Sequence, residues 1–220
     1  INTGLELMQA DTEDIRKRIS VVGQRIVMEL NGYPCIDIEE TKRKKTIISS
    51  KSFGQKVTEI DDIKEAVSSY AARATEKLRD QKSKAKTISV YLRTSPFEKG
   101  GNRYTKSRTV QFIVPTSNTA RIIAEANKII DEIYCEGYRY QKTGITLLNL
   151  VNEKHVQESF YDESYKEEEI IMEVIDQVNS YYGSNTIFHA AQGTKRKWVM
   201  KSDSRSKKYT TSLKELPLVK

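Results

Sequence analysis

Apolar residues change their spacing repeatedly between residues 46 and 152, and this pattern restricts the fold more than any other feature. Alternating apolar and polar residues have the period of a half-buried strand, whereas spacings of three and four have that of an amphipathic helix. The resulting order predicts an α+β, ferredoxin-like β-α-β-β-α-β sandwich, with two helices on one sheet face and the other face open. The expected strands lie at 46–57, 87–93, 109–114 and 144–151, and the expected helices begin at Asp61 or Asp62 and near Asn118.

The second expected strand alternates most clearly. Ile88, Val90 and Leu92 share one face of the strand, which we expect to point into the core. The opposite face then lies on the open side of the sheet. It carries Thr87, Ser89, Tyr91, Arg93 and Ser95.

Residues 1–32 contain one expected helix before this sandwich. Asp11 or Thr12 can cap its start, and Asn31-Gly32 marks its end. A lone amphipathic helix cannot bury its own apolar stripe, so we expect it to belong to a domain that lies upstream. The stripe consists of Ile15, Ile19, Val22, Ile26 and Leu30.

The apolar spacing in residues 153–220 predicts a small α/β extension, which has an acidic start and a basic end. A helix that Asp162 or Ser164 can cap is followed by a short expected strand at 186–190 and by a basic tail with the single tryptophan, Trp198. The helix residues that we expect to face inward are Ile171, Val174, Ile175 and Val178.

Charge is distributed in blocks along the chain. The formal net charge is +7, but residues 41–150 alone carry +11 and residues 151–194 carry −7. A basic block of this length predicts a polyanionic partner, with a well-solvated surface as the equally weighted alternative. The linker at 33–45 contributes the densest cluster, Lys42-Arg43-Lys44-Lys45.

Several classes of protein are disfavoured. No apolar run has the length of a membrane helix, and Cys35 and Cys135 form no CxxC pair, which fits a reducing cytosol. Phosphate-loop, dinucleotide, hydrolase-elbow and zinc-protease motifs are absent, and His155 and His189 stand apart from any ligand cluster. We therefore expect no catalytic residue, no metal site and no cofactor in this chain.

The open sheet face and the basic linker are the candidate binding surface. Hydroxyl, amide and guanidinium groups are the donors that contact nucleic-acid phosphates. RNA-recognition domains share the element order but place aromatics on the open face of their third strand, whereas Phe112 here shares the core face with Val110. Backbone binding is therefore favoured over base stacking. The candidate DNA-binding residues are Lys42, Arg43, Lys44, Lys45, Lys51, Ser89, Tyr91, Arg93, Thr94, Arg108 and Lys142.

Several short stretches also resemble a known family. Ser50-Lys51-Ser52-Phe53-Gly54, Ser69-Tyr70-Ala71-Ala72-Arg73-Ala74, Arg93-Thr94-Ser95-Pro96-Phe97 and Gly137-Tyr138-Arg139-Tyr140-Gln141-Lys142-Thr143-Gly144 are similar to the UmuC branch of the Y-family translesion DNA polymerases. The matches occur in order along almost the whole chain.

The resemblance implies a domain organisation and a role in SOS DNA repair. Residues 1–32 would be the end of the thumb, 33–45 a linker, 46–152 the little finger and 153–220 the C-terminal extension of this branch. The palm and fingers, whose carboxylates hold Mg²⁺ in the family, have no counterpart here. The resemblance therefore implies a non-catalytic, DNA-gripping part of a cytoplasmic, nucleoid-associated polymerase, which binds primer–template DNA without sequence specificity.

One further pentapeptide, Gln157-Glu158-Ser159-Phe160-Tyr161, resembles the motif with which bacterial polymerases bind the sliding clamp. Its expected contacts are Gln157, Phe160 and Tyr161, while Glu158 departs from the usual apolar residue. The alternative function is a protein-interaction module that binds the clamp and the UmuD′ and RecA partners implied by the family, with DNA binding incidental.

Overall fold

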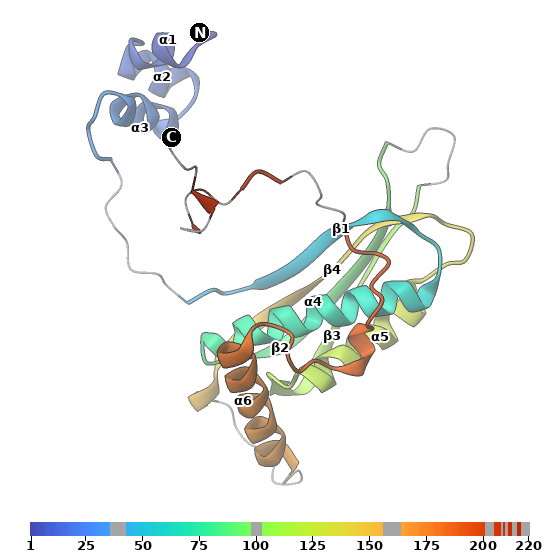
Figure 1. Cartoon of the computed structure of the whole chain (residues 1–220). Helices are drawn as coiled ribbons and strands as arrows, with labels where there is room; N and C mark the ends of the chain where they lie inside the picture. Colours follow the sequence, from blue (N-terminus) through green and yellow to red (C-terminus); the bar gives the residue numbers. More distant parts are fainter. Residues whose placement is uncertain are drawn as a thin grey trace. The chain divides into compact units, whose positions relative to one another are not determined.

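The computed structural model describes residues 1–35, 43–97, 103–155, 164–200, 205–207, 209, 211–212 and 215–216. It contains two compact units, Ile1–Arg43 and Lys44–Lys220, which we describe separately (Figure 1).

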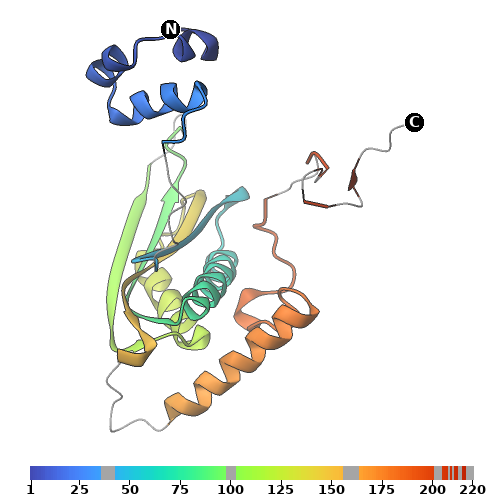
Figure 2. The same cartoon turned by 90° about the vertical axis from the view of Figure 1, so that its left-hand side faces the viewer.

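The larger unit is built on a four-stranded antiparallel sheet in the order β1-β4-β2-β3. Figure 2 shows the helices of this larger unit on one side of the sheet. The expected α+β class, the element order and the two layers are confirmed. The strand order itself differs from a ferredoxin sandwich, in which the first and third strands are central. The elements are β1 (Ile47–Val57), α4 (Ile60–Asp80), β2 (Ser83–Thr94), β3 (Thr105–Thr116), α5 (Thr119–Ile133) and β4 (Tyr140–Asn152).

The core lies between the sheet and these two helices. Ile88, Val90 and Leu92 of β2 are fully buried, which confirms their expected direction. Because β2 is central, it packs under α4 and α5 together with fully buried side chains from both helices. These include Ile63, Val67, Leu78, Ile122, Ile129 and Ile130.

The start of α5 agrees with the sequence prediction, whereas the N-cap of α4 differs from it. Asn118 caps α5 by accepting a hydrogen bond from the backbone N–H of Arg121. At α4 the N-cap is Glu59, so Asp61 and Asp62 are first-turn residues and not caps. There they lie at the positive end of the helix dipole, which favours carboxylates.

The smaller unit contains three short helices, α1 (Gly4–Met8), α2 (Thr12–Arg18) and α3 (Val21–Leu30), in place of the single expected helix. The Ser20 hydroxyl accepts hydrogen bonds from two backbone N–H groups and starts α3. This cap ends the preceding helix and rotates the apolar stripe. Ile15 and Val27 are buried as a result, whereas Ile19 is exposed. Val22, Ile26 and Leu30 are exposed as well.

Within the larger unit, the extension packs beside α4. It contains η1 (Glu153–His155), α6 (Ser164–Tyr182) and η2 (Ala190–Gln192). The strand expected at 186–190 does not form, because both backbone hydrogen-bonding groups of Ile187 pair with the Asn179 side chain. The expected inward face of α6 is also wrong in part: Met172 is buried, whereas Ile171 and Val174 are exposed.

Replacement of Ile88 by Ala should destabilise the fold by about 2–5 kcal/mol, because it removes a fully buried side chain from a close-packed core. The matched control is Ile48→Ala in β1, whose side chain is 60% exposed and which should cost less than about 1 kcal/mol. Urea unfolding of the two variants measures the difference. Equal losses of unfolding free energy in the two variants would contradict the assignment of Ile88 to the buried face and Ile48 to the exposed face.

Candidate nucleic-acid interface

One row of residues crosses all four strands on the face opposite the helices. Lys142 of β4 lies directly opposite Ser52 of β1 and Arg93 of β2, and Arg93 lies opposite Thr105 of β3. Directly opposed residues share a face of a sheet. Since Leu92 points into the core, its neighbour Arg93 and the whole row lie on the open face.

Two further rows beside it are rich in hydroxyl groups. A Cβ at Gly144 would collide with Ser50 and contact the Tyr91 ring, so only glycine lets these two side chains close over this strand. In the next row, the Thr109 hydroxyl donates a hydrogen bond of 2.9 Å to Ser89. The members of the two rows are Ser50, Gly144, Tyr91 and Ser107, followed by Ile48, Thr146, Ser89 and Thr109.

The electrostatic character of the sheet is uniform. None of the four strands contains an Asp or a Glu, while they contain eight Lys and Arg residues. Among the described residues, neither Arg93 nor Lys142 has a carboxylate within ion-pair distance, and Nε of Arg93 is buried without a hydrogen-bond partner. The open face therefore offers cationic and hydroxyl donors, without strand carboxylates to repel an anion.

The register places four candidates on the open face, Ser89, Tyr91, Arg93 and Lys142, and three others away from it. Lys51 is opposite Thr143, which is itself opposite Leu92, so Lys51 lies on the helix side of the sheet. The sequence-based prediction for Lys51 was wrong because one step along a strand reverses the face on which a side chain lies.

Arg108 and Thr94 are the other two corrections. Arg108 is opposite Val90 on the helix side and forms an ion pair of 2.6 Å with Glu132 of α5. Thr94 is 5% exposed, and its hydroxyl bonds to the backbone of Tyr104. Neither side chain belongs to the open face.

The basic linker is described only in part. Arg43, Lys44 and Lys45 are exposed, and the backbone of Lys44 exchanges two hydrogen bonds of 3.2 Å with the Gln81 amide. Lys42 lies outside the described residues, as do the three clamp-peptide candidates Gln157, Phe160 and Tyr161.

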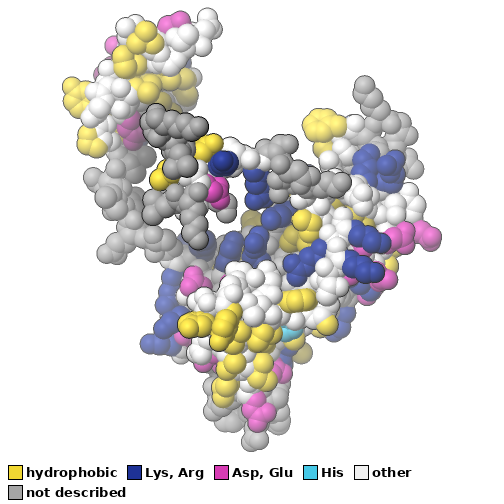
Figure 3. All heavy atoms as spheres, viewed as in Figure 1, with side chains coloured by type: hydrophobic (Ala, Val, Ile, Leu, Met, Phe, Trp, Pro, Cys, Tyr) yellow, Lys and Arg dark blue, Asp and Glu magenta, His cyan; other side chains and the backbone are white. Residues whose placement is uncertain are grey.

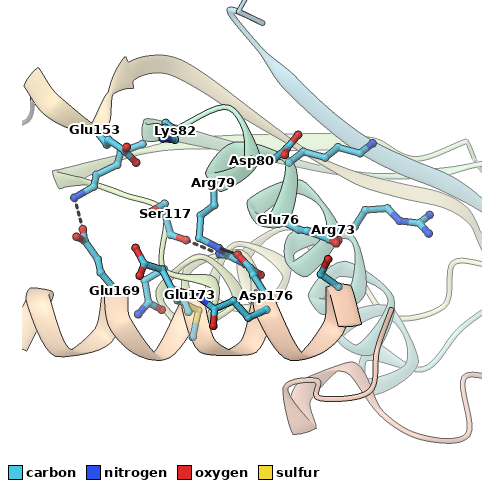
Figure 4. A pocket seen from close by; sticks show the side chains of 16 residues that line it. Arg73, Glu76, Arg79, Asp80, Lys82, Ser117, Glu153, Glu169, Glu173 and Asp176 are labelled. Atoms are coloured by element: carbon cyan, nitrogen blue, oxygen red, sulfur yellow. Dashed lines mark hydrogen bonds and ion pairs between the residues drawn. The ribbon is translucent and has the colours of Figure 1, made fainter. Parts of the chain in front are cut away.

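Some of the basic side chains are neutralised by acidic side chains of the same chain. Arg79 of α4 forms a bidentate pair with Asp176 of α6, with N–O distances of 2.5 and 2.7 Å (Figure 4). Arg121 pairs in the same way with Glu168, at 2.7 and 3.0 Å, and Lys84 pairs with Glu169. The acidic helix therefore neutralises cations on the helix side of the sheet.

Metal-ligating side chains do not cluster in the part of the chain that the structure describes. No group of three or more His, Cys, Asp or Glu residues could hold a metal ion there. Burial and the nearby Arg79 guanidinium lower the pKa of His189, which keeps its imidazole neutral near pH 7. No described helix combines the length and apolar character that a membrane crossing needs.

The open-face serines and threonines outside β2 were not among the sequence candidates. Ser50, Ser52, Thr105, Ser107 and Thr146 are placed there by register between strands, which is a long-range property. The sequence contained one signal that could have pointed to this surface: none of the four strands has an Asp or a Glu.

Comparison with known proteins adds the family. Residues 44–160 match the impB/mucB/samB family C-terminal domain, and residues 169–219 match a domain of unknown function, DUF4113. UmuC of Salmonella typhimurium is 38% identical over the whole chain, and MucB of Escherichia coli is 36% identical over 99% of it. A DNA polymerase IV from Clostridium acetobutylicum is 26% identical over 86% of the chain.

The chain spans about half the length of these relatives: 53% of UmuC, 52% of MucB and 47% of the polymerase IV. The family match covers all four strands of the sheet and both helices packed on it, which is the part that carries the open face. The chain therefore belongs to the impB/mucB/samB family, the UmuC branch of the Y-family translesion polymerases.

Proposed function

We propose that the open face of the sheet binds the phosphates of primer–template DNA without sequence specificity, as the DNA-gripping part of a translesion polymerase. The row Ser52, Lys142, Arg93 and Thr105 carries this proposal. It places two cations without carboxylate partners between two hydroxyl groups, on a sheet without acidic residues. Such donors contact phosphate oxygens and carry no sequence information.

The same face is poorly suited to reading bases. Tyr91 is the one aromatic side chain in its first three rows, and it lies half-buried over Gly144. Base stacking on a sheet uses several exposed aromatic rings. Contact with the phosphates alone suits a polymerase that copies damaged templates, because the grip then does not depend on the identity of the base.

We place the chemistry of DNA synthesis elsewhere in the whole protein. The Mg²⁺-binding carboxylates of the family belong to its palm, and this chain would contribute DNA and partner binding without catalysis. We further propose that the basic linker at Lys42–Lys45 adds phosphate contacts, and that the protein works in the cytoplasm at the nucleoid.

The second candidate function, a protein-interaction module, is favoured by a specific observation on α6. Ile170, Ile171, Val174 and Tyr181 are all more than half exposed, although they are large apolar side chains. An exposed apolar face of this kind marks interaction sites in soluble proteins. The sliding clamp, UmuD′ and RecA are the partners that this hypothesis assigns to the extension.

Arg93→Gln and Lys142→Gln should each weaken DNA binding to a similar degree on unrelated sequences, and should each reduce the salt slope of log K by about one unit. The matched control is Arg108→Gln, which removes a cation from the helix side of the same sheet. Fluorescence anisotropy with two duplexes at several salt concentrations measures both quantities. An equal loss in the control, or a flat salt dependence of the wild type, contradicts the proposed surface.

Phe160→Ala combined with Tyr161→Ala should abolish binding to a bacterial sliding clamp, because two large side chains would supply the contacts that fill its pockets. Surface plasmon resonance measures the binding, with Tm and DNA affinity as controls that should stay near wild type. A lowered Tm together with unchanged clamp binding would instead identify the two rings as structural.

A further inference from the structure

A polar cavity lies on the helix side of the sheet. It encloses about 630 Å³ between α4 and the segment that follows α6. Its wall is fixed by the backbone: the N–H of Gly54 in β1 donates a 3.0 Å hydrogen bond to the carbonyl of Trp198. A Cβ at Gly54 would collide with the carbonyl of Val199, so this close approach requires glycine.

Three buried hydrogen-bonding atoms of this cavity have no partner. Among the described residues, four buried side-chain polar atoms are unpaired, and three of them belong to cavity-lining residues: Ser69 Oγ, Tyr70 OH and Trp198 Nε1. Tyr70 and Trp198 are only 4% and 5% exposed. Folded proteins rarely leave buried polar groups unsatisfied, so three such groups on the lining residues of one cavity call for a hydrogen-bonding partner, which is water or a ligand.

Cations surround the same space. Lys51, Arg73 and Arg205 line the cavity, and none has a carboxylate within ion-pair distance among the described residues. The nearby Asp176 is already bound by Arg79, which leaves Glu76 as the remaining acidic side chain of the lining. Figure 3 shows Lys and Arg side chains gathered on this side of the molecule.

The donors determine the chemistry of the missing partner. An indole N–H, an ammonium and a guanidinium can only donate, so the ligand must be rich in acceptors and negatively charged. Tyr70 is available as a donor, because burial raises its pKa to about 12 and keeps the phenol protonated. A carboxylate has two oxygens, whereas a phosphate group has three or more and meets several donors at once.

We propose that this cavity is a phosphate-binding site, in which Ser69, Tyr70 and Trp198 bind the oxygens and Lys51 and Arg73 neutralise the charge. The volume exceeds that of inorganic phosphate and lies in the range of small-molecule pockets. The ligand is therefore a phosphate ester, either a nucleotide-sized molecule or a phosphate of a nucleic-acid strand. Either would connect the extension to α4, at a site whose lining includes neither of the open-face cations Arg93 and Lys142.

The only tryptophan of the chain reports directly on this site. The experiment titrates the 220-residue chain at constant ionic strength with sodium pyrophosphate and, separately, with a short oligothymidylate, and follows Trp198 fluorescence. We expect saturable binding that is weakened at least five-fold by Tyr70→Phe and by the exposed change Arg73→Gln. The control Lys106→Gln, at the opposite edge of the sheet, should stay within two-fold of wild type.

The outcomes separate the sources of the phosphate and can overturn the proposal. A response to pyrophosphate supports a small phosphate ester, and a response to the oligonucleotide alone supports a nucleic-acid strand. Arg93→Gln should leave either response intact, which distinguishes this site from the open face. The proposal is wrong if neither probe gives a saturable response, or if Tyr70→Phe and Arg73→Gln both bind like wild type.

Discussion

The burial of Ile88, Val90 and Leu92 under α4 and α5 is the constraint on which the sheet depends. β2 pairs with both β3 and β4, and β4 pairs with β1, so the direction of these three side chains determines the face of every residue opposite them. The hydrophobic core thereby also positions Arg93 and Lys142, which lie one step away along the pleat. The same buried side chains therefore stabilise the fold and determine where the candidate binding surface lies.

The cations of the larger unit fall into two groups with different roles. On the helix side, Arg79 and Arg121 form bidentate pairs with carboxylates of α6, and such pairs are partly shielded from solvent. On the open face, Arg93 and Lys142 have no such partners among the described residues. The net charge of the sequence does not distinguish the two groups. Among the described residues, unpaired cations also line the cavity on the helix side, namely Lys51, Arg73 and Arg205. The open face is favoured for DNA because its two unpaired cations lie in one row that crosses all four strands of a sheet without acidic residues.

Local patterns predicted the elements well and the long-range arrangement less well. The alternation in β2 and the helix start near Asn118 are local features and were predicted correctly. Lys51 was misplaced because the sequence around it, Ile47-Ile48-Ser49-Ser50, shows no alternation that defines a face, whereas the side of Arg108 could have been read from its spacing to Val110. Ser20 ended a helix that the apolar spacing alone continues. The docking of α6 depends on ion pairs between residues far apart in sequence, and no local pattern contains them.

The central claim is that primer–template DNA is bound through the open face of the sheet. Amide chemical-shift mapping by NMR tests it most directly, with the isotope-labelled chain titrated with a primer–template duplex. The account predicts that the largest shifts follow the row Ser52, Lys142, Arg93 and Thr105 across all four strands. Shifts concentrated on α4, α5 or α6, with this row unchanged, would contradict it.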